Sequence, residues 1–201
     1  MDFSFIYQYQ GLIFDLDGTL TDSMPFHAKA WDQVAREHGF SISKQQIYDL
    51  GGSSSHDIAR HFKELGNPVG DVDAFVQRKI DVYTANIDKV ALFENIANIL
   101  ITAKGKGLKI AIGTGTRIKN ATYILKAKKL DQYIDAVVTA EDVSLHKPNP
   151  DTFLQAAKRI GLKPQDCLVF EDGILGIEAA KNGNFDCIQV DNDKLVRFIK
   201  A

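Results

Sequence analysis

The run Gly11-Leu-Ile-Phe-Asp15-Leu-Asp17-Gly-Thr-Leu-Thr-Asp22 decides the fold. It begins with a short apolar stretch, and continuous rather than alternating apolarity predicts a strand buried on both faces, as in a parallel sheet. Two carboxylates, Asp15 and Asp17, follow at the carboxyl end of this strand. Because ligands of open parallel sheets bind beyond the carboxyl ends of the strands, we expect a functional site here.

Four further apolar runs predict strands, at Lys109–Gly113, Ala136–Thr139, Cys167–Phe170 and Cys187–Val190. Helical patterns separate them, at Glu94–Lys104, Thr116–Lys128, Asn149–Ile160 and Ile174–Asn182. The third of these helices has an entry signal, with Asn149 as the expected N-cap and Pro150 at the first helical position. Strands that alternate with helices predict an α/β fold, a Rossmann-like parallel sheet covered by helices.

The segment after the first strand breaks this alternation. Residues 23–89 contain helical patterns only, at 25–38, 43–48, 55–65 and 72–87. We therefore expect an α-helical cap domain of residues 23–89, called the helical insert below. It would be threaded between the two parts of a catalytic core, residues 1–22 and 90–201.

Composition excludes several classes of protein. The chain has 201 residues, with 24 Lys+Arg against 26 Asp+Glu and a net charge of −2, so neither nucleic acid nor a membrane is an expected partner. The N-terminus has no secretory signal and no apolar run is long enough to span a membrane, which predicts a cytoplasmic protein. The two cysteines, Cys167 and Cys187, lie in apolar runs and are expected as buried thiols.

Reactive side chains follow each of the first four predicted strands. They are Asp15 and Asp17, then Thr114, then Lys147 after a short loop, and finally Glu171 and Asp172. A lone Asp after a strand is usually a turn former or a helix cap, but four such groups at one sheet edge are hard to explain by chance. Carboxylates there could hold Mg²⁺, while a lysine and a hydroxyl could bind phosphate oxygens. These are the groups that phosphoryl transfer through an aspartyl-phosphate needs.

The motifs resemble those of the haloacid dehalogenase superfamily of phosphotransferases. They are Asp15-Leu-Asp17-Gly-Thr-Leu-Thr-Asp22, the strand that ends in Thr114, Lys147-Pro-Asn-Pro-Asp151 and Glu171-Asp172-Gly173. The helical insert directly after the first motif, and His27-Ala-Lys-Ala-Trp31 within it, are similar to the β-phosphoglucomutase subgroup and its phosphatase relatives. Within that subgroup, the chain looks most similar to bacterial phosphatases of fructose 1-phosphate and 6-phosphogluconate.

The resemblance implies a role for each matching residue. Asp15 would be the nucleophile, and Asp17 would protonate the leaving alkoxide and later activate water. Thr114 and Lys147 would hold the phosphoryl oxygens. Mg²⁺ would be bound by the carboxylates of Asp15 and Asp172 and by the backbone carbonyl of Asp17, with Glu171 at or beside the ion.

A phosphatase and a mutase differ in what the helical insert must grip. Counted from Gly52, Ser55 stands where the mutase has an arginine, and a serine has neither the charge nor the bidentate fork with which an arginine binds a phosphate. This difference favours a phosphatase. Arg60, one helical turn further on, could replace the arginine, and Lys79 matches a lysine that contacts substrate in the mutase. His27 is expected either to relay hydrogen bonds between insert and core or to be an ordinary helix residue.

A third hypothesis is a sugar-phosphate binder without catalysis. The presence of both Asp15 and Asp17 argues against it, because a binder needs no acid or base. The expected partner is a small phosphorylated sugar. We expect a monomer, because the helical insert has to open and close.

Overall fold

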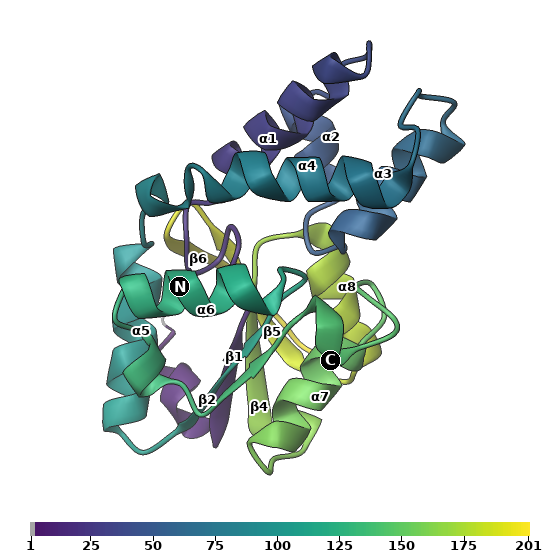
Figure 1. Cartoon of the computed structure of the whole chain (residues 1–201). Coiled ribbons are helices and arrows are strands. Elements are labelled where there is room, and N and C mark those ends of the chain that lie inside the picture. The colour runs from purple at the N-terminus through teal and green to yellow at the C-terminus, as the bar shows by residue number, and fades with distance from the viewer. Residues whose placement is uncertain (1–2) are drawn as a thin grey trace.

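A computed structural model of the chain describes residues 3–201. Six strands form one sheet in the order β3-β2-β1-β4-β5-β6. Strands β1 to β5 are parallel and β6 is antiparallel to β5. The strands are β1 (Gly11–Phe14), β2 (Lys109–Gly113), β3 (Ala136–Val138), β4 (Cys167–Glu171), β5 (Asp186–Asp191) and β6 (Lys194–Ile199). The α/β fold with a mostly parallel sheet is therefore confirmed (Figure 1).

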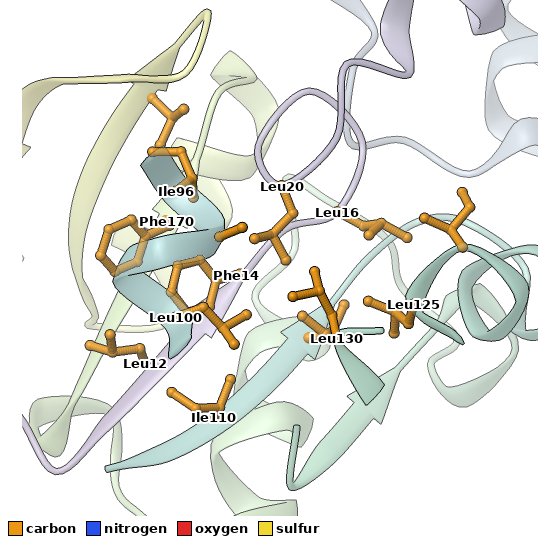
Figure 2. Close-up of a cluster of buried hydrophobic side chains, with 14 of the residues drawn as sticks. Leu12, Phe14, Leu16, Leu20, Ile96, Leu100, Ile110, Leu125, Leu130 and Phe170 are labelled. Carbon is orange, nitrogen blue, oxygen red and sulfur yellow. The ribbon is translucent and has the colours of Figure 1, made fainter. Parts of the chain in front are cut away.

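Two apolar layers sandwich the sheet, because successive residues of a strand point to opposite faces. Leu12 and Phe14 pack on one face against α5 (Glu94–Gly105) and α6 (Ile118–Ala127), as Figure 2 shows in part. Ile13 packs on the other face against α7 (Asp151–Arg159) and α8 (Ile174–Asn182). The central strand β1 is thus buried on both faces, and the loop that follows it is held firmly.

The helical insert lies apart from this sandwich, above the sheet in Figure 1. Its helices are α1 (Met24–Glu37), α2 (Lys44–Asp49), α3 (Ser55–Glu64) and α4 (Val72–Thr84). They bury an apolar cluster of their own, in which Trp31, Phe62 and Phe75 are the largest side chains. Side-chain oxygens of Ser43, Ser54 and Asp71 cap α2, α3 and α4. A short 3-10 helix, η2 (Ile87–Lys89), leads back to the core.

Strand β6 was not predicted, because it lies at the edge of the sheet and is only partly buried. Asn192 and Asp193 have φ values of 44° and 65°, as in a tight hairpin turn, so the Asn-Asp pair was the missed signal. Two predicted helix starts also shift. Helix α7 begins at Asp151, with Pro150 in the N-cap position, and α6 begins at Ile118 rather than Thr116.

The structure also bears on the cysteines and on membrane-spanning helices. Cys167 and Cys187 are free and buried in the neighbouring strands β4 and β5. Within residues 3–201, no helix combines the length and apolarity needed to cross a membrane. Residues 1 and 2, which belong to the segment read as lacking a secretory signal, lie outside the described part of the chain.

Candidate active site

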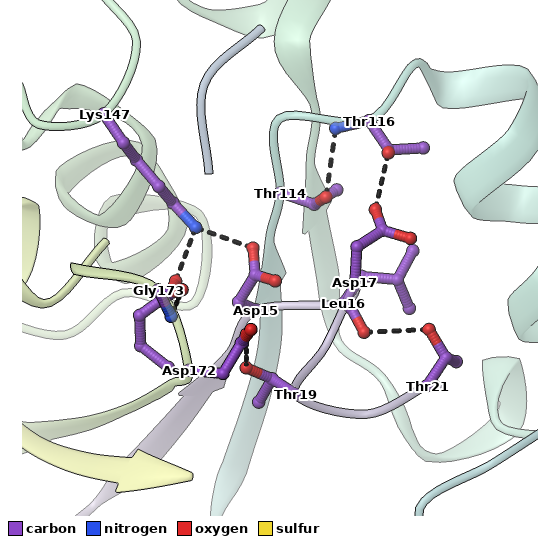
Figure 3. Close-up of polar contacts among 11 residues, drawn as sticks. Asp15, Leu16, Asp17, Thr19, Thr21, Thr114, Thr116, Lys147, Asp172 and Gly173 are labelled. Atoms are coloured by element: carbon purple, nitrogen blue, oxygen red, sulfur yellow. Dashed lines mark hydrogen bonds and ion pairs between the residues drawn. The ribbon is translucent and has the colours of Figure 1, made fainter. Parts of the chain in front are cut away.

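The loop after β1 presents Asp15 and Asp17 at the edge of the sheet (Figure 3). The Asp15 amide donates to the Phe170 carbonyl at 2.9 Å, which continues the ladder between β1 and β4. The loop then turns at Gly18, whose φ of +93° favours glycine. The Thr21 hydroxyl closes the turn by donating to the Leu16 carbonyl at 3.0 Å. These hydrogen bonds fix the backbone from which both carboxylates project.

Lys147 neutralises part of the charge at this edge. Its ammonium donates to Asp15 Oδ1 at 2.6 Å and to Glu171 Oε2 at 2.7 Å, and all three side chains are buried. Burial alone would lower the lysine pKa, but the two carboxylates outweigh it and raise the Lys147 pKa. The lysine is therefore a permanent cation, and two of its three donors are already used.

Three carboxylates share this neighbourhood. One oxygen each of Asp15, Glu171 and Asp172 lies within 4.8 Å of the others. Burial and the charge of Glu171 raise the Asp15 pKa well above its usual range and the Asp172 pKa to about 7. A single ammonium thus leaves an excess of negative charge. A divalent cation would relieve it, and a donor set of hard oxygens suits Mg²⁺ or a similar ion rather than a soft metal.

Asp17 has a different environment, in which hydrogen-bond donors surround its carboxylate. Its carboxylate accepts hydrogen bonds from the hydroxyls of Ser23 at 2.7 Å and Thr116 at 2.5 Å, and His27 Nε2 lies 3.1 Å away. Burial raises the Asp17 pKa, but His27 and the two hydroxyls outweigh burial and lower it below its usual range. Asp17 is therefore held as a carboxylate, the form of a base.

Lys79 extends this contact into the helical insert. Its Nζ lies 2.8 Å from His27 Nδ1, and both side chains are buried. An ammonium can only donate, so Nδ1 accepts and the imidazole proton is left on Nε2, facing Asp17. Burial and the charge of Lys79 lower the His27 pKa, which agrees with a neutral ring. The consecutive contacts from Lys79 to His27 and from His27 to Asp17 connect the insert with the core.

A cavity lies between the insert and the sheet. Its volume is about 50 Å³. The core lines it with Asp15, Asp17, Thr114, Gly115 and Thr116, and the insert contributes His27, Ser55 and Lys79 together with apolar residues such as Trp31. A loop of the insert closes it: a Cβ on Gly115 would lie 2.9 Å from the Gly52 carbonyl oxygen, so only glycine permits this approach.

Comparisons with known proteins show the family to which the chain belongs. Residues 12–190 match the sequence profile of the haloacid dehalogenase-like hydrolases. The chain belongs to that family. It is 38% identical to the fructose-1-phosphate phosphatase YqaB of Escherichia coli over 185 residues, 91% of this chain and 97% of the relative. Its enzyme class is that of the phosphatases of this family.

Solved structures show the same architecture. A hydrolase from Pseudomonas syringae superposes with a TM-score of 0.82 at 32% identity, covering 90% of this chain and 84% of the other. A β-phosphoglucomutase from Clostridium difficile superposes with a TM-score of 0.83 at 28% identity, covering 90% and 84%. A hydrolase and a mutase therefore share the fold described here, and the fold alone does not decide between a phosphatase and a mutase.

The structure brings most of the predicted site residues together. Asp15, Asp17, Thr114, His27, Ser55 and Lys79 all line the cavity. Lys147, Glu171 and Asp172 stand behind Asp15 and are not among the lining residues. The Thr114 oxygen accepts a hydrogen bond from the Thr116 amide at 3.0 Å, which leaves its own hydrogen free to donate. Arg60 instead pairs with Asp57 at 2.6 Å on the exposed face of α3.

Three polar partners were missed in the sequence. They are Ser23 and Thr116, which hold Asp17, and Thr19, whose hydroxyl donates to Asp172 at 2.7 Å. Each lies within six residues of a predicted site residue, and this proximity was the available signal. Their hydroxyls fix the orientation of carboxylates that the motifs had already indicated.

Gly18 lies where the loop that follows β1 packs closely against Asp172. A Cβ at this position would lie 2.2 Å from Asp172 Oδ2, and its φ of +93° adds strain for any other residue. We expect Gly18→Ala to displace Asp172 and to weaken binding of a divalent cation at least about tenfold, measured by calorimetric titration with Mg²⁺. Gly66→Ala is the matched control, because Gly66 also has a positive φ but its Cβ would meet nothing within 4 Å. Equal affinity in both variants would contradict the prediction.

Proposed function

We propose that the chain is a Mg²⁺-dependent phosphatase of small sugar phosphates, of the fructose 1-phosphate or 6-phosphogluconate type, that acts through an aspartyl-phosphate on Asp15. One observation carries the proposal: two carboxylates with opposite environments, Asp15 beside a lysine and two acids and Asp17 among hydrogen-bond donors, line the same cavity. Titratable groups whose environments separate their pKa values are suited to separate roles. The printed function of the Escherichia coli relative, a fructose-1-phosphate phosphatase, supports the substrate class.

The chemistry follows from these roles. A carboxylate oxygen of Asp15 forms a bond to phosphorus as the bond between phosphorus and the sugar oxygen breaks. Asp17 gives its proton to the departing oxygen, because a bound phosphate dianion nearby raises the pKa of Asp17 and favours its protonation. Asp17 then accepts a proton from a water molecule as the water oxygen forms a bond to phosphorus. The bond between phosphorus and the Asp15 oxygen breaks, which releases inorganic phosphate and restores the Asp15 carboxylate.

The metal and the phosphate ligands have defined candidates. Asp15, Asp172 and the carbonyl of Asp17 would hold Mg²⁺, with Glu171 at or beside the ion. When bound, the ion supplies positive charge that offsets the negative charge of the carboxylates and of the phosphoryl group. The Thr114 hydroxyl, which lines the cavity, and the Lys147 ammonium, which lies beside Asp15, would hold the phosphoryl oxygens.

Residues 23–89 would act as a cap that opens for substrate and closes over it. The cavity of about 50 Å³ is far smaller than the roughly 300–1,000 Å³ typical of ligand pockets, so the insert has to move before a sugar phosphate can enter. Closure then excludes water and brings His27 and Lys79 to Asp17. The core, residues 1–22 and 90–201, would remain the fixed part.

A mutase is the second candidate, favoured by the similarity to β-phosphoglucomutase. It would need cations in the insert to grip a second phosphate. Among residues 3–201, Lys79 is the one cationic side chain of the insert that lines the cavity, and it already donates to His27. Ser55 lines the cavity without charge and Arg60 does not line it. This side of the cavity suits a sugar end that carries no second phosphate.

A panel of sugar phosphates tests the proposal. We expect purified protein with Mg²⁺ to release phosphate from small sugar phosphates, with fructose 1-phosphate and 6-phosphogluconate among the better substrates, measured as free inorganic phosphate. Release from none of them would refute the phosphatase, and binding without release would indicate the non-catalytic protein. Conversion of β-glucose 1-phosphate to glucose 6-phosphate with a bisphosphate primer would establish the mutase instead.

A further inference from the structure

Tyr83 lies directly against the contact that joins the insert to Asp17. Its ring stacks on the His27 imidazole, with ring centroids 3.9 Å apart and planes 14° from parallel. Tyr83 belongs to the last turns of α4, and His27 belongs to α1, so the stack ties together the two ends of the insert that connect to the core. Both side chains are buried.

The same ring borders the ammonium of Lys79. Lys79 and Tyr83 are one helical turn apart on α4, and His27 and Trp31 are one turn apart on α1. The ammonium lies 5.4 Å from the centre of the Tyr83 ring and 5.0 Å from that of Trp31. Burial lowers the pKa of Lys79 to about 8, and the aromatic faces favour its charged form, in which Lys79 donates to His27.

The orientation of the imidazole plane decides whether both of its nitrogens reach their partners. Its two nitrogens are used in opposite directions, one toward Lys79 and one toward Asp17, so both contacts require the same ring plane. The torsion that rotates a histidine ring is broad and does not select one plane. The parallel face of Tyr83 selects it, because tilting the imidazole would drive its edge into the phenol ring.

We propose that Tyr83 is a positioning residue: its ring holds the His27 imidazole in the plane in which Nε2 reaches Asp17, and so orients the Asp17 carboxylate toward the cavity. The inference rests on the proposed function, since it assigns Tyr83 to the proton transfer by Asp17. The proposed role belongs to the aromatic ring of Tyr83 and not to its hydroxyl. Tyr83 is therefore proposed to act through His27, without contact to the substrate.

Three variants test the proposal by steady-state kinetics. Tyr83→Leu removes the stack and should lower kcat about tenfold, as expected for loss of one aromatic pair, with KM changed less than about twofold. Tyr83→Phe keeps the ring and should stay within about twofold of the unaltered protein. Phe75→Leu is the matched control, because Phe75 is a buried aromatic of the same helix that contacts Trp31 and His38 rather than His27. It should lower the melting temperature and leave kcat unchanged.

A double-mutant cycle shows whether Tyr83 acts through His27. On a His27→Ala background, Tyr83→Leu should cause no further loss of kcat. An additional tenfold loss there would overturn the proposal, as would equal losses in Tyr83→Phe and Tyr83→Leu, or a rise in KM without a change in kcat. If Tyr83→Leu does not fold, Tyr83→Met, whose flexible side chain fills irregular gaps in a core, takes its place.

A readout independent of activity separates this inference from the proposed function. Imidazole nitrogen NMR should show His27 as one tautomer with its proton on Nε2 in the unaltered protein and in Tyr83→Phe, and as a mixture in Tyr83→Leu. An inactive protein that shows this difference would refute the phosphatase while retaining the positioning role. An active protein in which Tyr83→Leu changes neither kcat nor the tautomer would refute the positioning role alone.

Discussion

Replacing Asp15 by asparagine should lower kcat for phosphate release by a factor on the order of 10⁴ or more, because the amide cannot form the acyl-phosphate bond. Asparagine has nearly the same shape, and its side-chain oxygen can still accept from Lys147, which now donates to Asp15 at 2.6 Å. The fold and the substrate site should therefore persist. Phosphate release under saturating substrate and Mg²⁺ measures the effect.

Two controls make this result specific. Asp131→Asn removes an exposed carboxylate in η3 (Asp131–Tyr133) and should leave kcat unchanged. Acid-quenched protein should carry labelled phosphate after a single turnover of the unaltered chain and none in Asp15→Asn. Turnover by Asp15→Asn near the original rate would mean that another residue is the nucleophile.

Removing divalent cations should have the second largest effect. Treatment with EDTA is expected to lower kcat about 10³-fold, the size of an effect of several kcal/mol on the barrier, and added Mg²⁺ should restore it. The physical reason is the crowding of Asp15, Glu171 and Asp172, whose excess negative charge one lysine cannot offset. Without a cation, a phosphate dianion would be repelled from Asp15.

The same experiment distinguishes a bound ion from general salt effects. Potassium chloride at equal ionic strength should not restore activity after chelation. Asp172→Asn should raise the Mg²⁺ concentration needed for half-maximal activity, because it removes one of the three carboxylates. Full activity in the presence of excess EDTA would remove the metal from the mechanism.

Much of the fold could be predicted from the sequence, because the patterns that indicate its strands and its helices are both local. Continuous apolar runs such as Gly11–Phe14 predict buried strands, and a helical period between them predicts a covered parallel sheet. Strand β6 was missed because an edge strand needs little apolar surface. Its burial depends on Phe5 and the end of β5, which no local pattern of Lys194–Ile199 contains.

The site could be predicted as residue types but not as contacts. Spacing placed Asp15, Asp17 and Lys147 at one sheet edge, since parallel strands end on the same side. It did not show that Lys147 would pair with Glu171 behind Asp15, or that Tyr83 would lie on His27, because these contacts join residues 24 and 56 positions apart in the chain. Such contacts arise only from the tertiary fold.

The position of β1 in the sheet has a consequence for the order of assembly during synthesis. Gly11, the first residue of β1, pairs with Lys109 on β2 and with Cys167 on β4. Both neighbours of this central strand are therefore synthesised long after β1 leaves the ribosome. The apolar cluster of the helical insert needs no residue beyond Val82 and is complete well before then. Non-local pairing of this kind slows folding. The nascent chain therefore carries an exposed β1 and the acidic loop behind it until the C-terminal half arrives, and the active site is among the last parts of the molecule to form.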